Sequence, residues 1–239
     1  MLEQKPAANI TASITGNSST LHEPNKLRLG IIGLGKMGGN LALQAKEKNI
    51  TVIGKSRDPR PDLERNGVKV VDDYESFVSY LDKPRVIYLS LPAGPTIDNV
   101  LKEVLPYLEK GDVVMDGGNS FYMDSIRREK ELFDNGIYFL DCGTSGGLEG
   151  ARHGACFMVG GRDGGIKIAE PFLKTLAIND AGYVWTGQPG SGHFVKLVHN
   201  GIEFGMLQSR RRRISITPRK WIQFKSSPNF QKLVKRICY

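Results

Sequence analysis

The sequence lacks any long hydrophobic run and has few cysteines, and both absences limit what the protein can be. No run approaches the roughly 20 apolar residues that a membrane-spanning helix needs. The first 26 residues lack the apolar core of a secretory signal, and they contain no Arg, which argues against a mitochondrial presequence. Cys142, Cys156 and Cys238 are not spaced as pairs of metal ligands. We therefore expect a cytoplasmic protein in a reducing compartment, with a disordered leader over residues 1–26 and no metal site.

Acidic residues are absent from the last 31 positions, and this absence accounts for the net charge of +8. Residues 209–239 hold ten Lys and Arg residues, so residues 1–208 hold 23 basic and 25 acidic residues, a net charge of −2. The body of the protein is therefore slightly acidic. We expect neither nucleic acid nor a membrane as its partner, because Arg runs are more typical of a solvated tail.

What the sequence does have is an alternation of strand and helix patterns from residue 27 onward. Short apolar runs typical of buried strands lie at 27–32, 50–53, 68–71, 85–89, 113–115, 137–140, 156–159 and 183–185. Segments with helical spacing lie at 36–48, 96–108, 123–133, 165–176 and 191–207. Repeated strand–helix units predict an α/β fold with a Rossmann-type doubly wound sheet, mostly parallel, with helices on both faces.

A glycine-rich turn, GLGKMG at 33–38, links the first predicted strand to the first predicted helix. Its glycines allow a tight turn and a close approach of the backbone to a pyrophosphate, and the helix N-terminus supplies N–H groups. Such a turn also occurs in unrelated α/β proteins, but its place in the first strand–helix unit favours dinucleotide binding. The residues expected to contact the cofactor are Gly33, Gly35, Lys36, Met37 and Gly38.

The end of the second predicted strand indicates which cofactor is bound. NAD enzymes usually carry Asp or Glu there, whereas this chain has GKSRD at 54–58. Lys55 and Arg57 can hold a 2′-phosphate and Ser56 can donate to it, so we favour NADP over NAD. Alternatively, Lys55 and Arg57 are solvated loop charges.

The loop Leu91-Pro92-Ala93-Gly94-Pro95 follows the fourth predicted strand. Ligands bind at such strand ends in open parallel sheets. Small residues suit a loop that passes close to a nicotinamide, although an ordinary Pro/Gly turn explains them equally well.

The last predicted helix carries a stripe of polar side chains. Lys196, His199, Asn200 and Glu203 stand at i, i+3, i+4 and i+7 among apolar residues. A solvated Lys–Glu pair would explain the stripe, but the glycine-rich turn before the helix and the intervening His and Asn favour a site. Seven residues rise about 10 Å along a helix, so the two charged groups can bracket a small substrate.

Two further stretches, 116–120 and 141–147, follow the fifth and sixth predicted strands. Each offers backbone N–H groups with a hydroxyl or an amide, which suit a carboxylate or sugar hydroxyls. Taken singly, each stretch is also compatible with a turn.

Taken together, these motifs resemble 6-phosphogluconate dehydrogenase over residues 27–208. The similarity is carried by residues 33–38, 116–120, 141–154 and 190–203, and Pro92-Ala93-Gly94 with Cys142-Gly143-Thr144 is closest to the family's shorter form. The resemblance implies oxidative decarboxylation of 6-phosphogluconate to ribulose 5-phosphate, a reaction of the pentose phosphate pathway, with reduction of NADP by a homodimer.

The resemblance also implies roles for individual residues. Lys196 would be the general base that takes the 3-hydroxyl proton, and Glu203 the acid that protonates C1 of the enediol. Both roles need a closed, partly dry cleft that shifts the pKa values of the two groups. The implied substrate contacts are Asn119, Ser145, Gly146, Gly147, His199 and Asn200. The implied cofactor contacts add Leu91, Pro92, Ala93 and Asn119 to the glycine turn, Ser56 and Arg57.

The chain departs from the family pattern in two places. Phe204 stands where many members have a Tyr that contacts the substrate phosphate. The pattern then stops near Gln208, whereas the family continues into an all-helical domain that forms the dimer. We therefore expect a leader at 1–26, an NAD(P)-binding domain at 27–190, the first helix of the helical domain at 191–208 and an atypical basic tail at 209–239.

Several hypotheses stay open. The tail is a frameshifted or wrongly assigned gene end, which we favour, a basic extension that binds nucleic acid or a membrane, or a deliberate short variant. The chain is an active enzyme or a catalytically dead dinucleotide-binding protein. A β-hydroxyacid dehydrogenase acting on substrates such as 3-hydroxyisobutyrate is disfavoured by His199 and Glu203, because without decarboxylation a second acid has no use.

Overall fold

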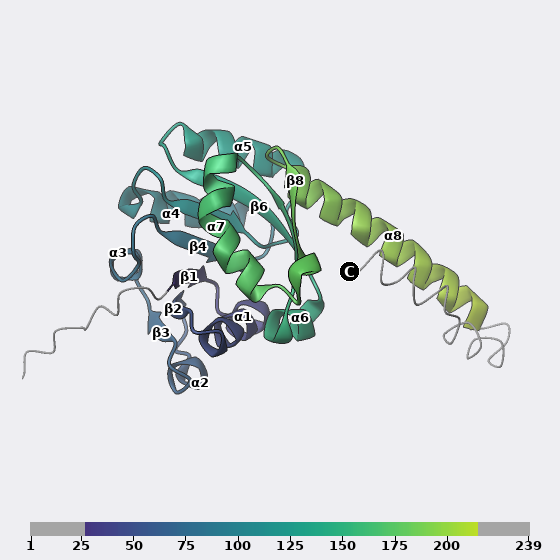
Figure 1. The fold of residues 1–239 in the computed structure, drawn as a ribbon, viewed down its shortest axis with the longest axis horizontal. Coiled ribbons are helices and arrows are strands. Elements are labelled where there is room, and N and C mark those ends of the chain that lie inside the picture. The colour runs from purple at the N-terminus through teal and green to yellow at the C-terminus, as the bar shows by residue number, and fades with distance from the viewer. Residues whose placement is uncertain (1–26, 215–239) are drawn as a thin grey trace, which may run out of the picture.

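Eight strands form one sheet in the computed structural model, which describes residues 27–214 (Figure 1). The strands are β1 (Arg28–Ile32), β2 (Thr51–Lys55), β3 (Lys69–Val71), β4 (Val86–Leu89), β5 (Val113–Asp116), β6 (Tyr138–Ser145), β7 (Cys156–Gly160) and β8 (Tyr183–Gly187). Their order in the sheet is β3-β2-β1-β4-β5-β6-β7-β8. The expected leader at 1–26 and residues 215–239 of the expected tail lie outside the described residues.

All neighbouring strands are parallel except β6 and β7. The strand order reverses between β1 and β4, which is the switch point where doubly wound sheets bind ligands. The predicted mostly parallel, doubly wound sheet is confirmed.

Helices cover both faces of the sheet. They are α1 (Lys36–Glu47), α2 (Pro61–Glu64), α3 (Tyr74–Ser79), α4 (Pro95–Val104), α5 (Tyr122–Phe133), α6 (Gly147–His153), α7 (Asp163–Leu176) and α8 (Ser191–Ile214), with short 3-10 turns η1 (Leu105–Tyr107) and η2 (Asp180–Gly182). Alternate strand residues point to opposite faces, so Ile31 packs in one buried cluster with α1 and α7 while Ile32 packs in the other with α3, α4 and α5. Because the central strands are buried on both faces, they read as continuous apolar runs.

Strand β6 is longer than the sequence pattern predicts. Residues 141–145, expected to follow the strand, continue it and pair antiparallel with β7. The last parallel pair with β5 joins Asp141 to Asp116. Beyond Asp141, β6 is paired only with β7, on its other side. Asp141 and Gly143 are of residue types that are depleted in strands, which hid this extension.

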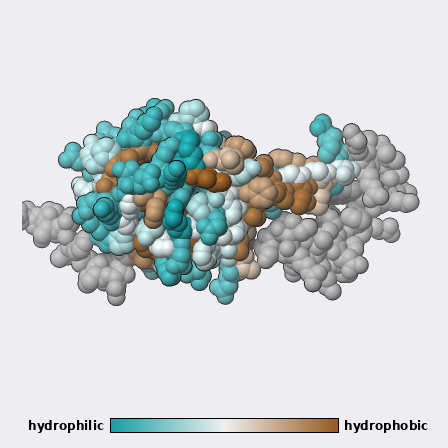
Figure 2. All heavy atoms as spheres, turned by 90° about the horizontal axis from the view of Figure 1, so that it is seen from above, coloured by the Kyte–Doolittle hydropathy of each residue, from teal (hydrophilic) through white to brown (hydrophobic). Residues whose placement is uncertain are grey.

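Helix α8 also differs from its prediction, because it runs to Ile214 and not to residue 207. No Gly or Pro interrupts residues 206–214, and Arg is a good helix former. Its first turns contact β6, β7 and α5, whereas its later turns leave the body as an arm (Figure 1). Apolar side chains on the arm, such as Ile202 and Phe204, are exposed (Figure 2). Within residues 27–214, no helix is both long and apolar enough to cross a membrane.

Candidate cofactor and substrate cleft

A cleft of about 1450 Å³ lies along the carboxyl ends of the strands. Its walls come from the turn after β1, the loops after β4 and β5, the end of β6 and the start of α6, and helix α8. The predicted site residues that line it are Gly35, Lys36, Met37, Leu91, Pro92, Ala93, Asn119, Ser145, Gly146, Gly147, Lys196, His199, Asn200 and Glu203. Those that do not line it are Gly33, Gly38, Ser56 and Arg57.

Two of the three motif glycines in the turn after β1 are required by packing. A Cβ on Gly33, whose φ is +93°, would lie 2.4 Å from the carbonyl oxygen of Ser90. A Cβ on Gly38 would lie 2.0 Å from the carbonyl oxygen of Gly33. Gly35 differs, because it lines the cleft and no atom lies within 4 Å of its Cβ position. The space beside Gly35 is therefore available to a ligand.

The N-terminus of α1 presents an uncompensated positive end to this space. Its N-cap is Gly35, which offers no side-chain hydrogen bond, and its first turn contains no acidic residue. The first N–H groups of a helix have no partner within the helix, so they and the helix dipole favour an anion. The residues present fit the pyrophosphate of a dinucleotide.

The segment expected to choose the cofactor lies beside this turn. Lys55 ends β2 in register with Ile32 of β1, and its carbonyl accepts a hydrogen bond from the N–H of Gly33 at 3.1 Å. The amine of Lys55 lies 4.7 Å from the centre of the Tyr74 ring and the residue is buried. Lys55 is thus engaged with an aromatic ring, whereas Arg57 is exposed.

Lys196 is held against the sheet by glycine. The residue is 8% exposed, and a Cβ on Gly143 of β6 would lie 2.6 Å from the Cβ of Lys196. Burial lowers the pKa of Lys196, while the charges of Glu203 and Cys156 raise it. The net lowering is the direction that a general base needs.

Glu203 stands in a wetter environment. Its side chain is 50% exposed, whereas that of His199 is 14% exposed, and His199 Nδ1 lies 3.8 Å from the Glu203 carboxylate. The expected partly dry cleft is therefore present around Lys196 and absent around Glu203. Residues 201–205 of α8, which include Glu203, are all exposed.

Sequence reasoning missed part of the cleft floor. The hydroxyl of Tyr88 on β4 lies 2.7 Å from Thr144 Oγ1 on β6, which spans β5 between them. Gly117 makes room for this bridge, because a Cβ there would lie 2.0 Å from the Tyr88 hydroxyl. The glycine directly after a strand was the available signal. Apolar lining residues such as Ile178 and Val184 had no sequence signal.

The sheet order, the glycine turn at the switch point and the cleft across the strand ends define a dinucleotide-binding protein of the Rossmann class. The model of the NAD binding domain of 6-phosphogluconate dehydrogenase matches residues 28–187. The chain belongs to the 6-phosphogluconate dehydrogenase family, as its motifs predict.

Known proteins agree with this assignment. YqeC of Bacillus subtilis, whose name describes it as a 6-phosphogluconate dehydrogenase, is 44% identical over 183 residues. These are 76% of this chain and 61% of that protein. The decarboxylating 6-phosphogluconate dehydrogenase of Schizosaccharomyces pombe is 43% identical over 190 residues, 75% of this chain and 39% of that protein. The chain therefore spans less than two thirds of the length of these relatives.

Solved structures give the same result. The 6-phosphogluconate dehydrogenase of Plasmodium falciparum, described with its cofactor NADP+ and its substrate 6-phosphogluconate, superposes with a TM-score of 0.72 at 33% identity, covering 76% of this chain and 41% of that one. The 3-hydroxyisobutyrate dehydrogenase of Mycobacterium tuberculosis has a TM-score of 0.66 at 22% identity, covering 81% of this chain and 68% of that one, and shares the fold.

Proposed function

We propose that this chain is the dinucleotide-binding and catalytic part of an NADP-dependent enzyme that oxidatively decarboxylates 6-phosphogluconate to ribulose 5-phosphate. The observation that carries the proposal is Lys196, a buried residue whose amine has a lowered pKa and which lines the same cleft as the glycine turn. Relatives named decarboxylating 6-phosphogluconate dehydrogenase and the Plasmodium falciparum structure with NADP+ and 6-phosphogluconate support it.

The cofactor would lie across the switch point. Gly35, Lys36 and Met37 would hold its pyrophosphate, and the loop 91–93 would lie along the nicotinamide. Ser56 and Arg57 would hold the 2′-phosphate, because they follow β2 directly beside the turn. NADP, when bound, supplies the hydride acceptor.

The chemistry of the chain would be carried by α8. The neutral amine of Lys196 takes the proton of the substrate 3-hydroxyl as hydride leaves C3. As an ammonium group, Lys196 then donates to the 3-keto oxygen while the C1–C2 bond breaks and CO2 departs. Glu203 donates a proton to the former C2, which is C1 of the resulting enediol in the numbering of ribulose 5-phosphate. Asn119, Ser145, His199 and Asn200, with the N–H groups of Gly146 and Gly147, would orient the sugar acid.

We also propose a domain division that follows from this arrangement. Residues 27–190 form the dinucleotide-binding domain, and residues 191–208 carry catalytic groups to its edge as the start of a second, helical unit. The exposed apolar arm of α8 supports the second part, because a helix that is apolar on several sides is normally buried.

The full chain with Lys196→Met tests the proposed reaction. We expect loss of NADPH formation and of CO2 release from 6-phosphogluconate, with the Kd for NADP within about twofold of the parent, because the side chain acts on the substrate and not on the cofactor. Stopped assays of both products and calorimetric titration of NADP provide the measurement. Near-parental kcat in the variant would refute the role of Lys196.

The exposure of Glu203 favours a second candidate, a dinucleotide-binding protein without turnover. An acid that is half in water is poorly placed to protonate a bound enediol. Binding of NADP by the parent chain with no product at any concentration of 6-phosphogluconate would select this candidate. Oxidation of 3-hydroxyisobutyrate without CO2 release would select the β-hydroxyacid dehydrogenase.

A further inference from the structure

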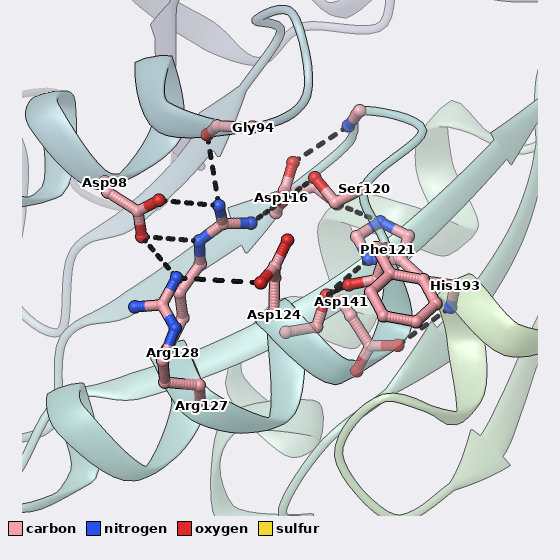
Figure 3. A network of polar contacts seen from close by, with 12 residues as sticks. Gly94, Asp98, Asp116, Ser120, Phe121, Asp124, Arg127, Arg128, Asp141 and His193 are labelled. Atoms are coloured by element: carbon pink, nitrogen blue, oxygen red, sulfur yellow. Dashed lines mark hydrogen bonds and ion pairs between the residues drawn. The ribbon is translucent and has the colours of Figure 1, made fainter.

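A buried histidine outside the proposed reaction joins α8 to the sheet (Figure 3). His193, in the first turn of α8, is 2% exposed. Its Nδ1 lies 2.7 Å from the hydroxyl of Ser125 on α5, and its Nε2 lies 3.1 Å from the main-chain oxygen of Asp116 at the end of β5. One side chain thus connects α8 to α5 and to the end of β5, which precede His193 by 68 and 77 residues at the two contacts.

The partners fix the proton on the ring. A main-chain oxygen can only accept, so Nε2 of His193 must donate to Asp116. In the neutral ring, Nδ1 then accepts from the hydroxyl of Ser125. With both nitrogens used in this way, a rotation of the ring about its bonds would break both hydrogen bonds, so the orientation of His193 is fixed.

The backbone at the start of α8 is anchored to β6 by a second group. The carboxylate of Asp141 accepts hydrogen bonds from the N–H of Gly190 at 2.7 Å and from the N–H of His193 at 2.8 Å. Gly192 lies so close to β6 that a Cβ on it would be 2.3 Å from the carbonyl oxygen of Asp141. These contacts fix how closely the backbone of α8 approaches β6. The ring of His193 adds a side-chain contact from this turn to the sheet, at the end of β5.

Asp116 serves the cleft as well as His193. Its carboxylate accepts from the N–H of Gly118 at 3.0 Å and from the hydroxyl of Ser120 at 2.6 Å, which holds the loop that carries Asn119. Arg128, completely buried, lies 3.6 Å from the same carboxylate. Asp116 therefore holds this loop through its carboxylate and holds α8 through its main-chain oxygen, which contacts His193.

Lys196 lies one helical turn after His193. Residues three apart share a helix face, so the rotation of α8 at residue 193 decides where the side chain at residue 196 points. The close packing of Lys196 on Gly143 leaves little room for an altered rotation.

We infer that His193 is a positioning residue whose Nε2–H bond to Asp116 fixes α8 relative to the loop 117–119 and so holds the amine of Lys196 in the cleft. Its effect on turnover rests on the proposed function, whereas its effect on Lys196 does not. A histidine that merely fills space would contribute to stability and leave the surroundings of Lys196 unchanged.

Three substitutions at position 193 in the full chain separate these roles. His193→Gln keeps an amide N–H that can reach the Asp116 oxygen, whereas His193→Asn keeps only an acceptor for Ser125. His193→Ala removes both bonds. His153→Ala is the matched control, because that histidine side chain is 62% exposed on α6 and does not line the cleft.

The first readout is the titration of Lys196 itself, by NMR of the full chain labelled with [13Cε]lysine and assigned with Lys196→Arg. In the parent and in His193→Gln, we expect the Lys196 signal to titrate at lower pH than the other lysines. In His193→Ala and His193→Asn, we expect its midpoint to move up by about one pH unit as the amine reaches water. The control should match the parent.

The second readout is steady-state kinetics with NADP and 6-phosphogluconate. We expect His193→Ala and His193→Asn to lower kcat by about tenfold with little change in the KM for NADP, and His193→Gln to recover most of the loss, because small displacements of a reacting group cost rate more than binding. If the parent chain shows no turnover, the proposed function fails and the titration still decides the inference.

Two results would overturn the inference. One is an unchanged Lys196 titration in a folded His193→Ala chain whose melting temperature alone has fallen. The other is an equal Lys196 titration in the His193→Gln and His193→Asn variants, which would show that the hydrogen bond to Asp116 does not position Lys196. Should His193→Ala fail to fold, the comparison of Gln with Asn decides between the same alternatives.

Discussion

At the scale of residues, the site depends on places where a side chain is missing. Lys196 can lie against β6 because Gly143 has no Cβ, and Tyr88 can reach Thr144 because Gly117 has none. The sequence showed these glycines within motifs but not what they face. That information depends on pairing between strands, which no local pattern contains.

Gly143→Ala should therefore destabilise the protein, because the position is closely surrounded by α8. The new methyl group would lie 2.6 Å from the Cβ of Lys196 and 2.9 Å from the carbonyl oxygen of Gly192, so α8 must shift. We expect a loss of about 1–3 kcal/mol in the free energy of unfolding, measured by urea denaturation.

The matched control for this prediction is Gly201→Ala, on α8 itself. No atom lies within 4 Å of its Cβ position, and Ala has the higher helix propensity. We expect no loss of stability and a gain in helix content by circular dichroism. Equal losses in the two variants would show that Gly143 is not a packing requirement.

At the scale of elements, we expect the two glycines at the start of α1 to have different roles: Gly38 is needed for folding and Gly35 for binding. Gly38→Ala should lower the melting temperature, because its Cβ would overlap the backbone of Gly33. Gly35→Ala should leave the melting temperature unchanged and weaken NADP binding about tenfold, equivalent to about 1.4 kcal/mol, because its methyl group would enter the cleft. Thermal melts and calorimetric titration check both, and a destabilised Gly35→Ala would contradict the division.

Helices α4 and α5 are joined by an ion pair whose pH dependence can be measured. Arg128 and Arg127 hold the pKa of Asp98 down to about 2, with the hydrogen bond from Arg128 as the largest cause. The folded-state pKa lies below the ordinary value of 3.8, so this pair stabilises the protein above that value, and the contribution is lost as pH falls towards 2.

We therefore expect the unfolding free energy of the parent chain to fall between about pH 4 and pH 2 more steeply than that of Asp98→Asn. Urea denaturation at a series of pH values measures the difference. Asp124→Asn is the matched control, since the Asp124 carboxylate lies 3.9 Å from Arg127, whereas the ion pairs of Arg128 are with Asp98 and Asp116. Parallel curves for the parent and Asp98→Asn would remove the ion pair as a source of acid sensitivity.

Most elements could be predicted from the sequence, because buried parallel strands read as apolar runs and the helices have clear periodicity. The two errors of extent have physical reasons. The second half of β6 is strand only because β7 lies beside it, and α8 continues because nothing in its own sequence ends it. The motif stripe on α8 was visible, but the unequal burial of Lys196 and Glu203 depends on where the helix leaves the body.

At the scale of the whole molecule, one helix belongs to two environments. The first turns of α8 are anchored by Asp141 and His193, whereas residues 201–205 lie exposed on the arm. Local stability follows such contacts. We expect backbone amides at 194–198 to be protected in hydrogen exchange about as well as β6, and those at 204–211 to exchange much faster.

Mass spectrometry of peptides from the full chain can resolve these two segments. The matched comparison is α5, a helix of 12 residues in which Ser125, Arg128, Glu129 and Leu132 are buried. Uniform protection along α8 in a monomeric sample would show that the arm is covered by something other than the described residues.

Strand β6 carries a further consequence. Asp141, which receives the start of α8, and Gly143, on which Lys196 rests, are two residues apart and so point to the same side of the pleat. A deletion of one residue before them would turn both to the opposite side together. The placement of α8, which begins some fifty residues downstream, therefore depends on which residues of β6 face each side of the sheet.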